Sequence, residues 1–371
     1  MFDMSFLESD IFKHLEKLVS FDTRNPPRKI SQESPIFAYL KDNLEGFSFK
    51  IIDAGEGCLS LLAIRGNPEL LFNFHIDTVP IADGWNSNPF ELIKVDDKLV
   101  GLGACDIKGA AACMLSAVNH SKGDVALLFS SDEEHGSSRA IKKFLTTEHG
   151  FKKVIVAEPT KAKAVLAHRG IQTATATFSG ESGHASEQRA IKDNAIHKAG
   201  KWIALVTEWF EKQLTSVDQL TGIPFNIGNI KGGIKANMIA ANCEMKFGFR
   251  ALPGQDSSEI LSTLQQLGKE TAVSSSLALT TGFFGPCLPA ANQSFQEMTL
   301  SAKNLAQQLN LEIGTAVNFW TEASLFSEQG ITAFVFGPGD IAQAHTANEW
   351  VAISQLEAVE NKYTNILENQ L

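Results

Sequence analysis

The sequence predicts an α/β fold that carries a second, α+β module, and three observations support this. Short, near-continuous apolar runs have the composition of strands buried on both faces of a sheet. These runs are residues 59–64, 70–74, 125–129 and 154–156. They alternate with stretches of helical spacing near 110–119 and 138–145. From about residue 171 to 285 the pattern changes to strands of alternating polarity and amphipathic helices, which is typical of an α+β module.

The individual elements follow from apolar spacing and from helix-breaking residues. A first helix is predicted over 9–21, with Asp10 near its start and Pro26 and Pro27 beyond its end. The middle of the chain predicts strands at 172–178, 225–230 and 243–249, with helices at 190–210 and 257–267. After Gly285 and Pro286, the spacing predicts a helix at 295–309, a strand at 333–336 and a closing helix at 354–367.

The composition argues against several classes of protein. The formal charge of −10 comes from 42 acidic and 32 basic residues spread along the chain, which argues against a nucleic acid or an anionic membrane as partner. The five cysteines have no CxxC spacing, so neither a disulfide framework nor a thiolate zinc site is predicted. The N-terminus has no apolar signal region, and no apolar run approaches membrane-spanning length. We therefore expect a cytoplasmic protein.

Acidic and histidine residues follow several of the predicted strands, at positions that meet at one edge of a sheet. The candidate metal ligands are His75, Asp106, Glu134, Glu158 and His345. Imidazole and carboxylate groups suit Zn²⁺, Co²⁺ or Mn²⁺, and one carboxylate can bridge two ions. Each of these residues taken alone is more often a solvated helix cap or an ordinary histidine. Together they predict a metal site with room for two divalent ions.

The adjacent residues Glu133 and Glu134 suggest a division of labour. Neighbouring side chains on an extended segment point in opposite directions, so only a turn brings both into one site. One carboxylate can then bind metal while the other takes a proton from water and delivers it to a leaving amine. The alternative is a pair of exposed acids ahead of a helix that begins near Ser137. Asp77 is expected on the same strand face as His75, within reach of the far ring nitrogen of that histidine.

Further candidate groups lie in the middle of the chain. His184 stands among small residues at a turn, where a ligand can approach closely, although a lone loop histidine is more often simply exposed. Lys235 and Asn237 follow a pair of glycines. Arg250 or Arg169 could bind a carboxylate bidentately, but a surface salt bridge is the more frequent role of a lone arginine. If His345 and His75 share a site, this middle segment is an inserted domain and a candidate lid.

At these residues the chain resembles the di-zinc metallopeptidase and amidohydrolase family that contains acetylornithine deacetylase, succinyl-diaminopimelate desuccinylase and aminoacylase-1. The resemblance covers nearly the whole length and rests on motifs in family order: FNFHIDTVP, GLGACDIKG, LLFSSDEEHG, VAEPT, GHAS and AQAHTANEW. It implies an α/β, mixed-sheet, zinc-peptidase-like catalytic domain formed by residues 1–170 and 286–371. It implies that residues 171–285 form an inserted α+β, ferredoxin-like lid and dimerisation domain of a homodimer.

The resemblance implies a role for each metal ligand. His75 and Glu158 would bind one ion, Glu134 and His345 would bind the other, and Asp106 would bridge the two. The ions implied are two Zn²⁺, or Co²⁺.

The same resemblance assigns the remaining roles. Glu133 would be the general base, and Asp77 would orient His75. His184 would donate to the scissile carbonyl across a dimer interface. The residues implied for binding the substrate carboxylate are Arg250, Asn237, Arg169 and Lys235.

The expected activity is hydrolysis of the N-acetyl amide of a small N-acetyl-L-amino acid. N²-acetyl-L-ornithine, in arginine biosynthesis, is the first expectation, and N-acetyl-L-citrulline is the alternative, because WTEASLF and FNIGNIKGGIKANMIA resemble those branches of the family. Desuccinylation of succinyl-diaminopimelate and cleavage of a dipeptide are rivals with the same chemistry. A non-catalytic, metal-binding dimeric scaffold is the rival from another class, and the intact pair Glu133 and Glu134 argues against it.

Overall fold

The computed structural model describes residues 6–27, 30–134, 138–269 and 277–369. Contacts divide the chain into two compact units. The first unit comprises residues 1–166, 296–314 and 321–371, and the second comprises 167–295 and 315–320. The second unit thus includes three segments outside the expected range of 171–285, namely 167–170, 286–295 and 315–320. The reason is backbone pairing, because His168 bonds to Leu288 in both directions and also forms a bridge to Val317.

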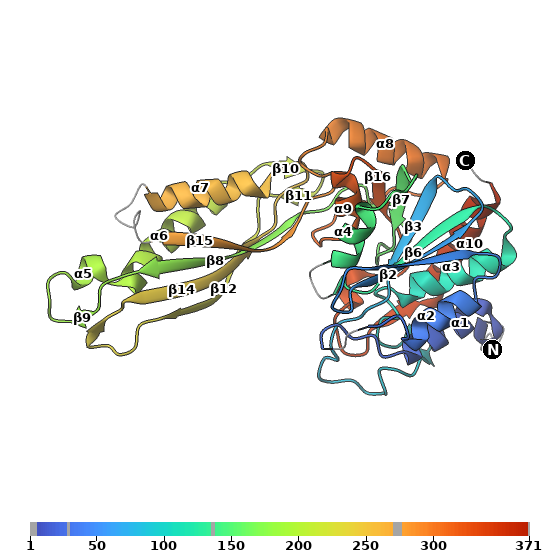
Figure 1. The fold of residues 1–371 in the computed structure, drawn as a ribbon, viewed down its shortest axis with the longest axis horizontal. Helices are drawn as coiled ribbons and strands as arrows, with labels where there is room; N and C mark the ends of the chain where they lie inside the picture. Colours follow the sequence, from blue (N-terminus) through green and yellow to red (C-terminus); the bar gives the residue numbers. More distant parts are fainter. Residues whose placement is uncertain (1–5, 28–29, 135–137, 270–276, 370–371) are drawn as a thin grey trace. The chain divides into compact units, whose positions relative to one another are not determined.

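The first unit is built on a six-stranded mixed sheet with the order β1-β2-β6-β3-β7-β16 (Figure 1). Its strands are β1 (Ser48–Asp53), β2 (Leu59–Arg65), β3 (Leu70–His75), β6 (Val125–Ser130), β7 (Lys153–Val156) and β16 (Thr332–Val335). The neighbours β6, β3, β7 and β16 are parallel, whereas β2 is antiparallel to β1 and β6. The predicted α/β sheet and its four apolar strands are confirmed. Because parallel strands end at the same edge, the residues that follow β3, β6 and β7 lie close together.

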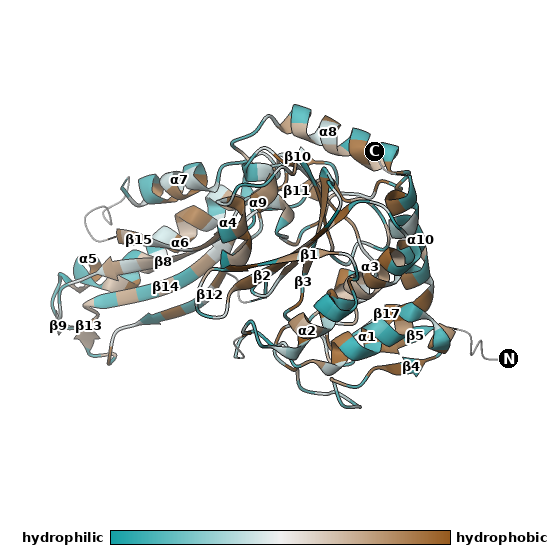
Figure 2. Cartoon of the chain, turned by 45° about the vertical axis from the view of Figure 1, so that its right-hand side comes forward, coloured by the Kyte–Doolittle hydropathy of each residue, from teal (hydrophilic) through white to brown (hydrophobic). Residues whose placement is uncertain are grey.

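Helices cover both faces of this sheet. On one face lie α1 (Asp10–Ser20), α3 (Lys108–His120), α8 (Phe295–Gln308) and α10 (Ile353–Glu368), whose apolar residues share one core with the strands. On the other face, α4 (Arg139–Leu145) contacts β1 and β2, and α9 (Ala323–Glu328) contacts β7 and β16. The strands β2 and β3 are mostly hydrophobic, while α1 and α10 mix polar and apolar residues (Figure 2). Sequence pattern and burial therefore agree.

Short elements complete the first unit, and their length explains why the apolar pattern did not indicate them. A three-stranded sheet has the order β17-β5-β4 and joins β17, just after His345, to β5, just before Asp106. The elements are η1 (Phe6–Glu8), α2 (Pro35–Asp42), β4 (Ile93–Val95), β5 (Lys98–Val100), η2 (Ile341–Gln343) and β17 (Trp350–Ala352). Across the described residues of both units, no helix is long and apolar enough to cross a bilayer.

The second unit has the ferredoxin-like order β-α-β-β-α-β. Its main elements are β8 (Ile171–Ser179), α6 (Ala195–Glu211), β12 (Phe225–Gly232), β14 (Asn242–Phe249), α7 (Ser257–Lys269) and β15 (Leu277–Gly285). The four strands form an antiparallel sheet with the order β12-β14-β8-β15. Trp202 on α6 is fully buried and packs its ring against Phe178 and Phe247 of the sheet. The predicted α+β module is confirmed.

One predicted helix of the second unit is wrong in its extent. The single helix expected over 190–210 is two helices, α5 (Ala190–Asp193) and α6. Asn194 separates them because its extended backbone and side-chain oxygen, which accepts from the N–H groups of Ile196 and His197, form an N-cap. The remaining short strands are β9 (Gly183–His184), β10 (Ser216–Val217), β11 (Leu220–Thr221) and β13 (Met238–Ile239).

Candidate metal centre

His75 is the last residue of β3 and is 2 % exposed. Its Nδ1 lies 3.0 Å from the backbone oxygen of Asp77, an acceptor, so Nδ1 carries the proton. Nε2 then faces carboxylates, with Asp106 Oδ1 at 3.0 Å and Glu158 Oε1 at 3.9 Å, and a proton or a metal ion on Nε2 satisfies them. Burial alone would lower the pKa of His75, but the hydrogen bond and charge of Asp106, with Glu158 and Glu133, raise it well above the usual value. This nitrogen is therefore placed to bind a cation.

Asp106 lies between two histidines. Its Oδ1 is 3.0 Å from His75 Nε2, and its Oδ2 is 3.4 Å from His345 Nε2. Burial opposes ionisation of Asp106, but hydrogen bonds and charge from both histidines hold its pKa below the usual value. The two oxygens of one carboxylate thus serve two separate imidazoles, which is the arrangement a carboxylate needs to bridge two ions.

The two halves of the cluster differ in exposure. Glu158 follows β7 and is 4 % exposed beside the buried His75. His345 has a side chain that is 55 % exposed, and its Nε2 lies 3.2 Å from Glu134 Oε1. The hydrogen bonds of Asp106 and Glu134 raise the pKa of His345 to about 10. One imidazole–carboxylate pair therefore lies deep in the protein, and the other lies at the rim.

The geometry of the cluster fits divalent ions. Ligand atoms of His75, Asp106 and Glu134 lie within 4.8 Å of one another. The ion pairs that Asp106, Glu134 and Glu158 make with described residues are with imidazoles, each offering a nitrogen lone pair when neutral. Two nitrogen and three carboxylate donors match the preferences of zinc and similar metals.

Glu133 and Glu134 lie in a turn after β6, as their joint use requires. Asp77 holds this turn, because its carboxylate accepts from the N–H groups of Glu133 (3.3 Å) and Glu134 (3.1 Å). Burial and the charge of Glu134 raise the pKa of Glu133 well above its usual value. The alternative of exposed acids before a helix near Ser137 concerns a residue outside the described ranges, and α4 begins at Arg139.

Asp77 itself differs from the expectation in two respects. It lies beyond the end of β3 rather than on the strand, and its backbone oxygen bonds Nδ1 of His75 while the nearer carboxylate oxygen stays 3.7 Å away. The carboxylate is occupied by the turn described above and by Asn25 Nδ2 at 3.3 Å. Asp77 therefore orients His75 through its backbone and organises Glu133 and Glu134 through its side chain.

Two buried carboxylates that the sequence analysis did not assign support this edge of the sheet. Glu349 accepts from three backbone N–H groups of the loop that carries Asp106. Glu322 accepts from Asn73 Nδ2 (2.8 Å) and Ser130 Oγ (2.9 Å), residues of β3 and β6. Both glutamates stand in segments already noted for family resemblance, TANEW and WTEASLF, and that is the signal that could have found them.

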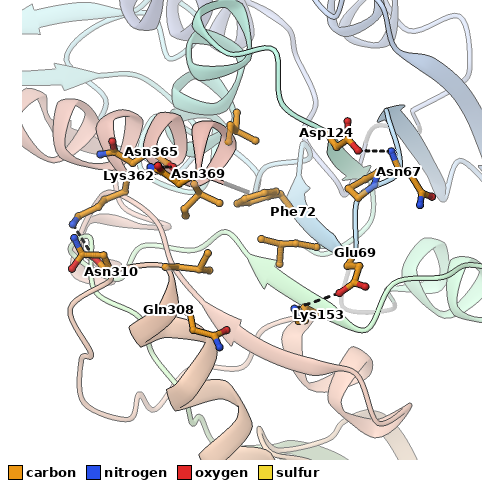
Figure 3. A pocket seen from close by; sticks show the side chains of 15 residues that line it. Asn67, Glu69, Phe72, Asp124, Lys153, Gln308, Asn310, Lys362, Asn365 and Asn369 are labelled. Carbon is orange, nitrogen blue, oxygen red and sulfur yellow. Dashed lines mark hydrogen bonds and ion pairs between the residues drawn. The ribbon is translucent and has the colours of Figure 1, made fainter. Parts of the chain in front are cut away.

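A cavity of about 560 Å³ lies at the opposite edge of the sheet, where β3 and β7 begin (Figure 3). Its charged groups have partners within the protein. Lys153 pairs with Glu69 at 3.5 Å, Asp124 accepts from a backbone N–H, and Lys362 Nζ donates to the backbone oxygen of Asn310 at 2.8 Å. None of the predicted site residues lines it. The chemistry-bearing residues therefore lie at one edge and this cavity at the other.

The remaining predicted residues lie in the second unit. His184 is exposed and lies in β9, which pairs with β13. Asn237 lies just before β13, and its backbone oxygen accepts from the N–H of Ala185, so His184 and Asn237 are neighbours. Lys235 is also exposed. Burial lowers the pKa of Arg250.

Arg169 is 2 % exposed, and its guanidinium is engaged by protein oxygens. The acceptors are Asn318 Oδ1 at 2.8 Å and the backbone oxygens of Gly222 at 2.6 Å, Thr221 at 2.9 Å and Arg250 at 3.4 Å. A role for Arg169 in binding a substrate carboxylate stays a prediction, and that role requires some of these bonds to open.

Comparison with known proteins identifies the family. The profile of peptidase family M20/M25/M40 matches residues 71–369. The chain belongs to this family. Among curated M20 relatives, N-acetyl-L-citrulline deacetylase of Xanthomonas campestris pv. campestris is 47 % identical over 356 residues, which cover 95 % of this chain and 96 % of the relative. Acetylornithine deacetylase of Myxococcus xanthus is 29 % identical over 366 residues, covering 92 % of each chain.

A solved structure of the family shares the fold. The dinuclear metal-binding M20 peptidase of Bacillus subtilis superimposes with a TM-score of 0.67 at 16 % sequence identity, covering 98 % of each chain. The predicted fold class and the predicted family are thus confirmed.

Proposed function

We propose that this M20 chain hydrolyses the acetyl amide of an N-acetyl-L-amino acid and releases acetate and the free amino acid. The observation that carries the proposal is the placement of Asp106, with one carboxylate oxygen toward His75 and the other toward His345. The rival of a non-catalytic scaffold is disfavoured, because Glu133 stands in the same turn as Glu134 and is not needed to complete either half of the cluster.

The metal ligands are proposed to act in two sets that share Asp106. His75 and Glu158 would hold one ion, and Glu134 and His345 the other. Two divalent ions, Zn²⁺ or Co²⁺, would polarise the acetyl carbonyl and make water nucleophilic at neutral pH. The backbone oxygen of Asp77 fixes the tautomer of His75 and so keeps Nε2 available as a ligand.

Glu133 is proposed as the general base. It would accept a proton from the attacking water as the water oxygen bonds to the acetyl carbon. It would then deliver that proton to the amide nitrogen as the C–N bond breaks, so that acetate and an amine leave. Asp77 prepares this step by holding the N–H groups of Glu133 and Glu134 in one turn.

N-acetyl-L-citrulline is proposed as the first substrate to test and N²-acetyl-L-ornithine as the second. From the sequence motifs alone, N²-acetyl-L-ornithine was expected first. The relative named for citrulline is 47 % identical, against 29 % for the Myxococcus relative named for ornithine, and this difference supports the change. Binding of the substrate carboxylate by Arg250, Asn237, Arg169 and Lys235, action of His184 across a homodimer, and a cytoplasmic location stay predictions.

The proposal is tested by steady-state kinetics on both substrates with metal-loaded protein and with Glu133→Gln. We expect a higher kcat/KM for N-acetyl-L-citrulline and a loss of about 10²–10⁴-fold in kcat for Glu133→Gln, the usual contribution of a general base. Glu69→Gln, at the opposite edge of the sheet, is the matched control. Near-normal turnover by Glu133→Gln with full metal content would remove the proposed base, and failure on both substrates would refute the deacetylase assignment.

A further inference from the structure

Glu349 is a buried residue whose carboxylate hydrogen-bonds to the backbone of the loop carrying Asp106. It is 1 % exposed and accepts from the backbone N–H groups of Gly103 (2.9 Å), Cys105 (2.8 Å) and Asp106 (2.9 Å). Its own backbone oxygen accepts from Gly101 at 3.0 Å, one step beyond the pairing of β17 with β5. Both its backbone and its side chain therefore bind the same short loop.

These contacts determine the course of the loop. A buried carboxylate is strongly unfavourable unless hydrogen bonds replace its hydration. Three N–H groups from one loop supply them, and hydrogen bonds to an ionised group are about twice as strong as neutral ones. The backbone N–H of Asp106 donates to Glu349, and the carboxylate of Asp106 points to His75 and His345. A loop without Glu349 would have three buried donors to satisfy in another conformation.

The same carboxylate belongs to the segment that carries His345, four residues earlier. Asn348 ties this segment to another loop, because its Oδ1 accepts from the N–H of Asn86 at 2.8 Å and its Nδ2 donates to the oxygen of Gly84 at 3.1 Å. His345 has φ of 59°, in the left-handed region that non-glycine residues adopt uncommonly. Glu349 thus joins the loop of Asp106 to the segment of His345, which Asn348 also holds.

The consequence differs between the two halves of the metal centre. Asp106 belongs to both, whereas His345 belongs to the rim half alone. His75 and Glu158 come from β3 and the end of β7, which the central sheet holds in place without Glu349. A shift of Glu349 would therefore displace Asp106 and His345, which are two of the three rim ligands. Of the three deep ligands it would displace only Asp106.

We propose that Glu349 is a positioning residue that fixes Asp106 and His345 relative to one another and thereby sets the affinity of the rim site formed with Glu134. This inference rests on the metal centre of the proposed function. A carboxylate with a merely structural role would lower the stability of the fold and leave the ratio of the two metal affinities unchanged.

The test is titration of metal-free protein with Co²⁺ by calorimetry, which reports two binding steps without any substrate. In Glu349→Gln the amide nitrogen replaces an acceptor oxygen, so one of the three donors faces another donor. We assign the weaker Co²⁺ step to the rim site, whose His345 is more than half exposed. We expect this step to lose about 10–100-fold in affinity, the usual effect of removing a residue that supports a metal ligand. The tighter step, which shares only Asp106 with the rim site, should lose clearly less. Glu360→Gln is the matched control, since Glu360 on α10 also accepts a hydrogen bond, from Ser116 Oγ at 2.6 Å.

The outcomes separate this inference from the proposed function. Two Co²⁺ steps of wild-type affinity in folded Glu349→Gln, or an equal loss at both steps, would overturn the role of Glu349 and leave the deacetylase proposal standing. A wild-type protein that binds fewer than two Co²⁺ ions would overturn both. If Glu349→Gln does not fold, Glu349→Asp serves instead, because it keeps the charge but withdraws it by one methylene. The same selective loss at the weaker step is expected there, and an equal loss again overturns the inference.

Discussion

The two edges of the central sheet differ in how their charges are balanced. Where β3 and β7 begin, the lysines of the cavity are paired, Lys153 with Glu69 and Lys362 with a backbone oxygen. Where the same strands end, the three carboxylates of Asp106, Glu134 and Glu158 face only two imidazoles, so the carboxylates outnumber the cations even when both rings are protonated. At the first edge there is a cavity, but its lysines already have partners. At the second edge there is buried negative charge that an external cation would neutralise. Unbalanced charge therefore locates the chemistry better than cavity size does.

The strongest test of this contrast removes one aspartate from each edge. We expect Asp106→Ala to lose at least one metal ion and about 10³-fold or more in turnover, because Asp106 is the proposed shared ligand and a bound ion contributes several kcal/mol to stabilising the reacting charge. Asp124→Ala, which removes an acceptor of the backbone N–H of Asn67, should keep both ions and most of its activity. Metal analysis and kinetics on the two variants make the measurement. Equal losses would mean that the two edges are not functionally distinct.

Metal removal should affect stability as well as activity. An ion that binds only the folded chain stabilises it by about 2.7 kcal/mol when free metal is at 100 times its dissociation constant. We therefore expect the urea midpoint to rise with Zn²⁺ concentration in the wild-type protein and in Asp124→Ala, and to rise little in Asp106→Ala. A midpoint that is independent of Zn²⁺ in the wild type would contradict a metal-binding edge altogether.

Much of this arrangement follows from the sequence, since the apolar runs locate β2, β3, β6 and β7, and three of the proposed ligands, His75, Glu134 and Glu158, lie at or just after the ends of these strands. The rest depends on contacts that leave no pattern. The partner of His75 Nδ1 is a backbone oxygen, which every residue possesses, so the sequence suggested the carboxylate of Asp77 instead. The carboxylate of Glu349 and its three N–H donors are about 245 residues apart, and only the fold brings them together.

Substitutions at two glycines with the same backbone conformation can test how tightly the loop at the metal edge is packed. Gly46 and Gly103 have φ of +80° and +79°, so alanine at either position costs about 1–2 kcal/mol of strain. A Cβ at Gly46 meets nothing within 4 Å, whereas one at Gly103 would lie 2.7 Å from Thr78 Cγ2 and 3.0 Å from Lys108 Cδ. We expect Gly103→Ala to lose about 1–3 kcal/mol more unfolding free energy than Gly46→Ala, measured in urea. Equal losses would show that the loop yields without cost.

The smallest effect concerns His14, a buried histidine outside the metal centre. It is 5 % exposed, compared with 2 % for His75, but its ring faces the hydroxyl of Tyr39 at 2.8 Å and the amide of Asn119 at 3.4 Å instead of carboxylates. Burial lowers the pKa of His14, whereas carboxylates raise that of His75. Two histidines of similar burial therefore differ in pKa because of their partners.

This difference predicts a direction for the pH dependence of folding. The unfolded chain protonates His14 near its ordinary pKa of 6.5, while the folded chain resists protonation, so the unfolding free energy should fall as the pH drops below about 6.5. The contribution of one group is at most about 1.4 kcal/mol per pH unit. Urea unfolding of metal-free wild type and His14→Gln between pH 7.5 and about 5.5 should give a shallower decline in the variant. A steeper decline in His14→Gln would mean that the folded protein favours the protonated ring, and burial would then not control the pKa of His14.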